Sequence, residues 1–380
     1  MNKKEISELR SRLQLDKNAI SCIRGCYVND KREVVSVFDY SLMSLPQEEA
    51  EKYLALFKRT LAGVPAKNLI DVDFSVDQVM DSEEHRLLME MRNTALKDDD
   101  IVNAFYLKVI ESLVIDGNYL ILLMHDSYDV PFRGRDDVKV DDASEEVFSY
   151  ILCSICPVKL TKPALSYFAV ENEFHSREID RIVASPEVGF IFPRFDDRAS
   201  NIYGALYFTR DAANTHEELI DAVFHAEMPM PAVEQKETFQ SVLEEALEDE
   251  MSLEVVQTVH EQLRERLEEH NTDKTAEPLT ISRNEVKNVL ESCGVSEEHV
   301  AKFEEKYDEQ FGLGMGLTAN NIVDAKKFEL RTPDVVIKVN PERSDLVETR
   351  MIDGSKYILI RADEGVEVNG VNIRIGQKEQ

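Results

Sequence analysis

Five residues about a third of the way along this 380-residue sequence combine side chains that can do chemistry: HDSYD, residues 125–129. A histidine beside carboxylates can act as a general base with an orienting partner, or can bind a metal ion. The run follows an apolar segment, and α/β proteins place their sites at the ends of central strands. His125, Asp126 and Asp129 are therefore candidate catalytic residues. A turn stabilised by aspartate side chains explains them without catalysis, since no partner motif occurs elsewhere.

Two cysteine pairs have spacings that suggest redox chemistry or metal binding. Cys153 and Cys156 form a CxxC, but redox-active CxxC motifs lie at helix N-termini. This pair lies in a predicted strand, where residues three apart point to opposite faces. Cys22 and Cys26 share one face of a strand, yet zinc needs two further ligands and no second close pair supplies them. We therefore predict that the cysteines pack in the core, and that the protein has no metal site and no cofactor.

Two further patterns argue against nucleotide or DNA recognition at their positions. Residues 312–316, GLGMG, lack the GxGxxG spacing of a dinucleotide-binding loop and follow a predicted helix. Residues 282–311 have helix–turn–helix spacing, but the second helix carries six acidic residues against two lysines. Phosphates repel such a helix. We interpret it as one half of a packed helical hairpin.

Basic residues gather most densely in one region near the C-terminal end. Groups of this kind are usually solvated surface, and a concentrated one can also contact nucleic acid phosphates. The candidate nucleic-acid-binding residues, called the basic group below, are Lys326, Lys327, Arg331, Lys338 and Arg343.

The composition excludes several classes of protein. A formal net charge of -30 predicts high solubility and repulsion of DNA backbones and anionic membranes. No apolar run approaches the roughly 20 residues that a membrane helix needs. Five cysteines in a chain of this length are too sparse and too odd in number for a disulfide framework. With a charged, amphipathic N-terminal segment in place of a signal peptide, we expect a cytoplasmic protein with no membrane association.

Two apolar runs must position the HDSYD residues. Residues 118–124 and 150–158 are short, rich in Ile, Leu, Val and Tyr, and bounded by turn formers, which predicts strands buried on both faces. We expect them to be adjacent central strands, joined by an exposed acidic insert at residues 132–146. Before them, residues 19–38 predict a hairpin. A helix is expected from Ser44, with Gln47 in the capping-box position, to Gly63.

The rest of the chain predicts two domains in an α+β fold. The N-terminal domain, residues 1–270, has a central, mostly antiparallel sheet with flanking helices, including acidic helices near its end. Polar residues 271–279 are the expected linker. Residues 280–380 predict a helical hairpin, opened by Ser282 and Glu285 in a capping box, and a small antiparallel β-meander. The pairs Asp353-Gly354 and Asn369-Gly370 favour tight hairpin turns in that meander.

Three segments give the sequence a specific resemblance to a known family. They are NYLILLMHDSYDVP, YILCSICPVKL and TPDVVIKVNPERSDLVETRMIDG. With them, nearly the whole chain resembles a bacterial family known as domain-of-unknown-function family 4317. This resemblance implies no activity.

A second, more distant resemblance concerns only the order of the elements. The layout is similar to the nucleoid-associated protein family, whose members are described as binding double-stranded DNA. That family also has a hairpin and long helix, two apolar central strands, an acidic helical middle, and a helical segment followed by a β-meander. The resemblance implies DNA association for this chain, and it transfers no functional residue.

Two hypotheses for function follow from different classes. The first is a cytosolic, non-enzymatic protein that acts through macromolecular contacts, with protein partners or self-association. In this hypothesis binding to DNA or a DNA complex is weak and independent of sequence, and the net charge disfavours it. The alternative is an enzyme, or a small-molecule or metal-binding protein, with its site at His125, Asp126 and Asp129. A real site there requires a cleft and a third convergent polar group.

Overall fold

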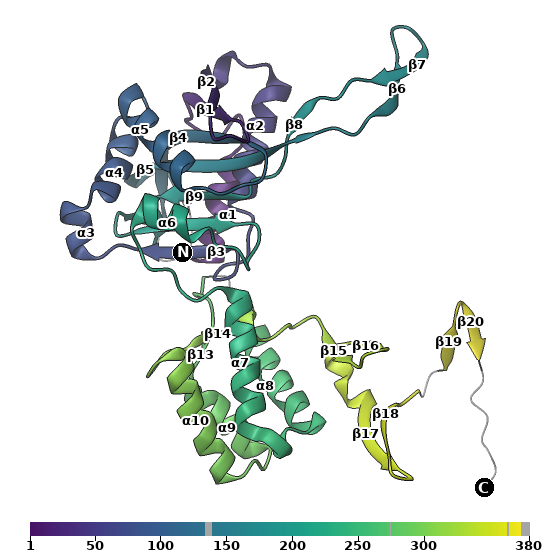
Figure 1. Ribbon diagram of the computed structural model, residues 1–380. Coiled ribbons are helices and arrows are strands. Elements are labelled where there is room, and N and C mark those ends of the chain that lie inside the picture. The colour runs from purple at the N-terminus through teal and green to yellow at the C-terminus, as the bar shows by residue number, and fades with distance from the viewer. Residues whose placement is uncertain (134–138, 274, 363–364, 374–380) are drawn as a thin grey trace. The chain divides into compact units, whose positions relative to one another are not determined.

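The computed structural model describes residues 1–133, 139–273, 275–362 and 365–373. Figure 1 shows mixed helices and strands, which confirms the predicted α+β class. The chain divides into two compact units, Met1–Glu234 with Lys274–Pro278, and Gln235–Asp273 with Leu279–Gln380. This grouping differs from the predicted boundary at residues 271–279, because the helices before it pack with those after it.

The first unit is built on one antiparallel sheet with strand order β2-β1-β4-β5-β9-β12-β3, and β8 also pairs with β5. The two predicted apolar strands are adjacent in its middle, as expected. The strands of this sheet are β1 Cys22–Val28, β2 Val34–Ser41, β3 Leu69–Asp73, β4 Asn118–Arg133, β5 Lys139–Leu160, β8 Arg181–Val183, β9 Val188–Phe192 and β12 Gly204–Thr209.

Helices cover both faces of this sheet because its central strands are apolar on both sides. Ile121 and Leu123 of β4 face a core with α4, α5 and α6. Leu120, Leu122 and Met124 alternate with them and face a core with α1 and α2. The helices of the unit are α1 Lys3–Arg12, α2 Gln47–Thr60, α3 Val76–Asp81, α4 Glu83–Asn93, α5 Asp99–Ser112 and α6 Glu217–Phe224.

The central strands are longer than the sequence predicts, and this corrects two expectations. β4 continues through residues 125–129, so HDSYD is strand and not a turn. The physical reason is continued alternation, since Tyr128 and Val130 are buried in the same core as Met124. The expected exposed insert is also largely strand, because β4 runs to Arg133 and β5 begins at Lys139.

The start of α2 is a third correction. The helix begins at Gln47 after Pro46, without a side-chain cap. Ser44 lies in a short 3-10 turn, η1 (Leu42–Ser44), where its hydroxyl donates to the Ser41 carbonyl oxygen at 2.8 Å. Proline disfavours the helical conformation in the residue before it, and Leu45 is extended (φ -76°, ψ 146°), so the helix starts only after Pro46.

A hairpin arm leaves the sheet between β5 and β8. It consists of β6 (Ala164–Phe168) and β7 (Glu173–Arg177), paired antiparallel. Figure 1 shows it extending away from the main sheet. The sequence did not predict an exposed arm here. A smaller pair, β10 (Arg194–Asp196) and β11 (Ala199–Asn201), follows β9.

The second unit joins a helical core to separate strand pairs. Ser282 and Glu285 form the predicted capping box at the start of α9. Positive φ values at Asp353 and Gly354 confirm the predicted tight turn. The strands after α11 are antiparallel as expected, but they form two-stranded pairs: β15 (Phe328–Arg331) with β16 (Val336–Val339), β17 (Val347–Ile352) with β18 (Ser355–Ile360), and β19 (Val366–Val368) with β20 (Val371–Ile373).

The helical core of this unit comes from both sides of the predicted linker. Within the described residues, no helix is both long and apolar enough to cross a membrane. The remaining elements are α7 Ala232–Leu247, η2 Glu248–Glu250, α8 Leu253–Asn271, β13 Thr280–Ile281, α9 Arg283–Ser292, α10 Glu297–Phe311, β14 Leu317–Thr318, α11 Ala319–Ile322 and η3 Pro341–Leu346.

Candidate functional site

The structure separates the three residues that the sequence proposed as a catalytic group. They lie in one strand, β4, where neighbouring side chains point to opposite faces of the sheet. Asp126 is fully buried on the side of α1, whereas His125 lies on the other face and Asp129 is exposed. No single cleft can therefore use His125 and Asp126 together.

Asp126 has partners that account for its burial. Its carboxylate accepts from the Arg12 guanidinium (Nη2–Oδ2, 3.1 Å), the Ala19 backbone N–H (2.7 Å) and the Tyr150 hydroxyl (2.9 Å). Arg12 also lies over the ring of Tyr128, 4.2 Å from its centroid. Burial, with the negative charge of Asp126 beside it, raises the pKa of Tyr150, which keeps its hydroxyl a donor. The cluster ties α1 and the segment after it to the sheet, which is a structural role.

His125 has a local partner of its own. Its Nε2 lies 2.8 Å from Ser149 Oγ on the neighbouring strand β5. Burial lowers the pKa of His125 below its ordinary value, against an opposing effect of Asp126. The imidazole is therefore neutral at pH 7. Depending on its tautomer, it accepts a hydrogen bond from the Ser149 hydroxyl or donates one to it.

This neutral histidine predicts an acid-sensitive contribution to stability. Between the ordinary pKa of 6.5 and the lower folded value, the unfolded chain binds the proton more readily than the folded protein. The neutral His125 therefore makes its full contribution to the free energy of unfolding above pH 6.5. This contribution is lost as the pH falls through the pKa that His125 has in the folded protein. His125→Gln should reduce the loss of unfolding free energy below pH 6.5, measured by urea denaturation across pH. The same slope below pH 6.5 in the wild type and in His125→Gln would contradict this prediction.

The cysteines lie as the strand geometry predicted. Cys153 faces the core with α4 and α5, and Cys156 faces the core with α1 and α2. All five cysteines lie within the described residues and are free thiols. Burial raises the pKa of Cys26 to about 11 and that of Cys156 to about 12, which keeps both protonated and unreactive.

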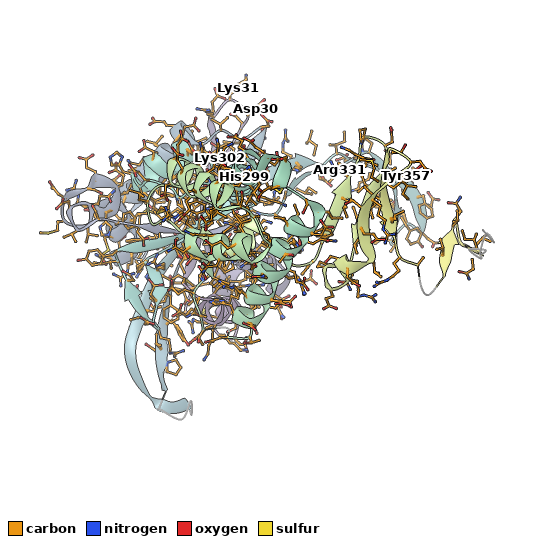
Figure 2. The ribbon with its side chains drawn as sticks, turned by 90° about the horizontal axis from the view of Figure 1, so that it is seen from below. Asp30, Lys31, His299, Lys302, Arg331 and Tyr357 are labelled. Atoms are coloured by element: carbon orange, nitrogen blue, oxygen red, sulfur yellow. The ribbon has the colours of Figure 1, made fainter. Side chains whose placement is uncertain are left out.

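The basic group does not form an uninterrupted positive surface. Arg331 and Lys338 lie on one face of the β15–β16 pair, and both contact Glu329 between them (2.8 Å and 3.8 Å). Arg343 pairs with Asp345 at 3.3 Å. Figure 2 shows Arg331 among the side chains of these strand pairs. The interleaved carboxylates reduce the positive potential that phosphates would meet.

The sequence did not identify a possible metal-ligand cluster in the second unit. One potential ligand atom from each of Glu248, Asp249 and His299 lies within 4.8 Å of the other two. Glu248 is already paired with Lys302, which lies one turn from His299 on α10 (Figure 2). His299 Nδ1 is 2.8 Å from Ser296 Oγ. These contacts explain the cluster as a helix-end network, so we assign no metal to it.

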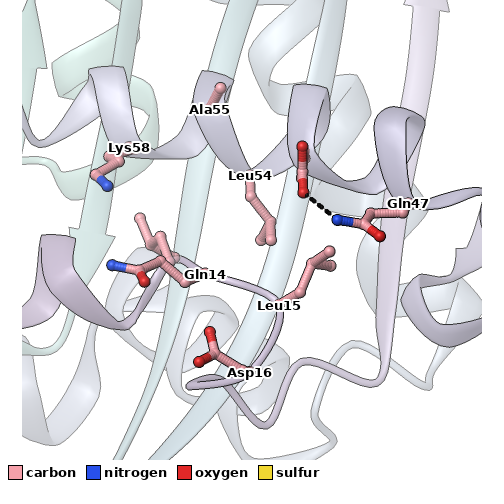
Figure 3. Close-up of a pocket in the computed structure, with 9 residues that line it drawn as sticks. Gln14, Leu15, Asp16, Gln47, Leu54, Ala55 and Lys58 are labelled. Carbon is pink, nitrogen blue, oxygen red and sulfur yellow. Dashed lines mark hydrogen bonds between the residues drawn. The ribbon is translucent and has the colours of Figure 1, made fainter.

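A hollow of about 460 Å³ lies between α2 and the segment that follows α1. Leu54 and Leu15 point toward one another across it, and Lys58 and Gln47 lie at its two ends (Figure 3). The Gln47 amide donates to Glu51 Oε1 at 2.8 Å, so the polar groups at that end of the hollow already bond to each other. The hollow is open and has a mixed lining, so it provides no convergent catalytic set.

The arm presents the clearest unexplained surface of the first unit. Residues directly opposite in an antiparallel pair share a face, so Leu165, Tyr167 and Phe174 lie together. The Tyr167 and Phe174 rings are 5.2 Å apart. Leu165 is 74% exposed, Phe174 is 68% exposed, and Val170 at the tip is fully exposed. The four side chains Leu165, Tyr167, Val170 and Phe174 are called the arm face below.

The opposite face of the arm is mostly polar, with one exposed aromatic ring, Phe168, whose centroid lies 5.6 Å from that of His175. His175 pairs with Glu171 (2.9 Å) and lies beside Glu173, while Ser166 stands opposite it in the register. The arm is therefore an amphipathic ribbon, although no part of the described chain covers its apolar side. The sequence contained this signal as the alternation in LSYF. Nothing in it showed that the strand would leave the sheet.

A second apolar surface lies at the foot of the arm, between α2 and β8. It is a groove of about 450 Å³ lined by Tyr53, Leu56, Ile182, Val183 and neighbouring α2 residues. Ile182 is 48% exposed and Val183 is 42% exposed. Its lining also includes the charged side chains Glu49, Lys52 and Arg59, and the Arg59 guanidinium donates to Ser185 Oγ at 2.6 Å. We call it the α2–β8 groove.

These features define an α+β protein with a projecting amphipathic arm and no assembled catalytic group among the described residues. The model of the family described as a domain of unknown function, DUF4317, matches residues 1–371. The chain therefore belongs to this family, as its sequence resemblance indicated. A search of curated proteins gives no match.

Proposed function

We propose that the protein is non-enzymatic and acts through contacts with other macromolecules, made by the arm face. The observation that carries this proposal is the exposure of Leu165, Tyr167 and Phe174 on one side of a two-stranded ribbon, with Val170 exposed at its tip. Removing apolar surface from water stabilises a protein or complex by about 25 cal/mol per Å². The exposed arm face forgoes this stabilisation. A contiguous exposed apolar patch with polar surroundings is typical of a binding surface.

The architecture of the arm supports the same proposal. A two-stranded hairpin without further packing is marginally stable in water. Here the polar face has its own ion pairs, whereas the arm face has the ring contact between Tyr167 and Phe174 and a hydrogen bond from the Tyr167 hydroxyl to Asn172 Oδ1. Docking on a partner would bury this face and stabilise the ribbon. Five free thiols suit the reducing cytoplasm in which we place this activity.

Affinity capture from a native extract tests this function directly. The full chain should retain a protein partner, or a second copy of itself, after nuclease treatment. Leu165→Ser with Phe174→Ser should lose that partner, because both changes remove apolar area from the arm face. Ser166→Ala with His175→Ser changes the polar face and is the matched control. Equal capture by wild type and the arm-face variant would contradict the proposal.

Direct contact with DNA is the weaker form of the proposal, and it rests on the basic group and the layout resemblance. We expect double-stranded DNA to bind weakly, without sequence preference, and to dissociate steeply as salt rises, since phosphate contacts release counterions. Changing Lys326, Lys327 and Lys338 to Glu should abolish it in a fluorescence-anisotropy titration. If the wild-type protein binds no DNA at low salt, direct DNA contact is wrong and a protein partner remains.

A further inference from the structure

We propose that the arm face docks in the α2–β8 groove of a second copy of this chain, and that the second copy's arm docks in return. This inference rests on the proposed function and names the partner. It joins two exposed apolar surfaces that lie on the same unit and that the described chain leaves uncovered.

The two surfaces match in chemistry. The arm offers Leu165, Tyr167 and Phe174 on a narrow ribbon. The groove offers Leu56 and Tyr53 on α2 and the exposed Ile182 and Val183 on β8. Both surfaces combine apolar side chains with charged ones, as protein interfaces do.

Charges around the two surfaces are also complementary. The tip of the arm is acidic, with Glu171 and Glu173 both exposed. Lys52 and Arg59 line the groove against a single carboxylate there, Glu49, and the last turn of α2 adds Lys58. Seating the tip near the C-terminal end of α2 would place carboxylates beside these cations. Such pairs fix the orientation of an interface more than they add affinity.

The groove cannot be filled by the arm of the same chain while the arm stays extended. The β8 strand of the groove begins at Arg181, at the foot of the arm. Phe174 lies seven residues earlier, which is about 23 Å of extended strand. The extended arm can instead reach the groove at the base of the arm in a second copy that is related by a two-fold axis. Each copy then gives one arm and receives one, which is the closed, reciprocal form of a symmetric dimer.

The surfaces are large enough for a stable dimer. Each large exposed side chain buries on the order of 100 Å², so one arm face and one groove from each copy together approach the roughly 800 Å² per partner of a standard interface. The net charge of -30 on each copy opposes association at long range. Screening limits that repulsion to about 8 Å at physiological salt, so contact at the arm can still dominate.

Sedimentation velocity of the full chain at physiological salt and tens of micromolar protein tests this inference. The wild type should be a dimer. The arm variant Leu165→Ser/Phe174→Ser and the groove variant Leu56→Glu/Ile182→Glu should each be monomers. Ser166→Ala/His175→Ser should remain dimeric. Urea denaturation of each variant shows that a lost dimer is not a lost fold.

Mixing the two monomeric variants gives the sharper result. The arm of the groove variant is intact, and so is the groove of the arm variant. A mixture should therefore form a heterodimer with one functional contact, at least tenfold weaker than the wild-type dimer, which a fluorescent label on one variant reveals. A labelled variant that stays monomeric in the mixture, while both variants are folded, overturns the reciprocal arrangement.

The outcomes separate this inference from the proposed function. A monomeric wild type overturns the second-copy inference, as does a dimer that persists in both the arm and groove variants. If the monomer captures a different protein through its arm face, the proposed function stands with another occupant. If it captures nothing and does not dimerise, both are wrong.

Discussion

Asp126→Ala should lower the free energy of unfolding by about 3–5 kcal/mol, the cost of removing one partner from a buried ion pair. The change removes the acceptor of the Ala19 N–H and the Tyr150 hydroxyl, and it leaves the Arg12 guanidinium with the Ser127 carbonyl oxygen in place of a carboxylate. Arg12 is held over Tyr128 and cannot move freely to water. Its positive charge would therefore remain only partly solvated. Urea denaturation followed by circular dichroism measures the loss.

Asp129→Ala is the matched control for this prediction. Asp129 lies in the same strand three residues later and is exposed. Its removal should change the free energy of unfolding by no more than about 0.5 kcal/mol. If both variants are equally stable, Asp126 does not anchor α1, and a role for it in binding or catalysis must be reconsidered.

Gly189→Ala should destabilise the protein by about 3 kcal/mol, at the upper end of the usual cost of overpacking. A Cβ at this position in β9 would lie 2.4 Å from the Cys153 carbonyl oxygen and 2.6 Å from Thr60 Cγ2. The first contact is with backbone in a paired strand, which cannot rotate away. The second is with the last residue of α2, whose hydroxyl lies 2.6 Å from Ser154 Oγ.

The neighbouring strand supplies a control for the Gly189 variant. A Cβ at Gly204 would meet the Arg194 guanidinium at 2.9 Å, which is paired with Asp73 and Asp196 but ends a long side chain and yields more easily than a backbone carbonyl. Gly204→Ala should therefore cost clearly less than Gly189→Ala in thermal or urea unfolding. Because α2 also forms one wall of the α2–β8 groove, Gly189→Ala should weaken dimerisation as well. Equal stability of the two variants would show that α2 and β9 can separate without cost.

The sequence predicted the elements whose signals are local. The apolar runs at 118–124 and 150–158 fixed the middle of the sheet, since only buried strands keep such runs apolar on both faces. The Ser282 capping box and the Asp353-Gly354 turn were also correct, because each depends on residues within four positions. The fold class followed from these elements.

What the sequence missed depends on distant contacts. The strand continues beyond Met124 because Tyr128 and Val130 pack in a core formed with residues distant in the sequence. That contact converts the expected HDSYD turn into strand and places His125 and Asp126 on opposite faces. The arm face and the α2–β8 groove were missed for the same reason, because exposure is a property of the folded chain.

Hydrogen–deuterium exchange of the arm is the most direct test of the central claim, that the arm face is a binding surface. An uncovered two-stranded ribbon opens readily, so its amides exchange fast. We predict that amides of β6 and β7 are protected at tens of micromolar protein, lose protection on dilution, and are unprotected in the Leu165→Ser/Phe174→Ser variant. Fast exchange across residues 164–177 at every concentration, unchanged by added native extract, would contradict the claim.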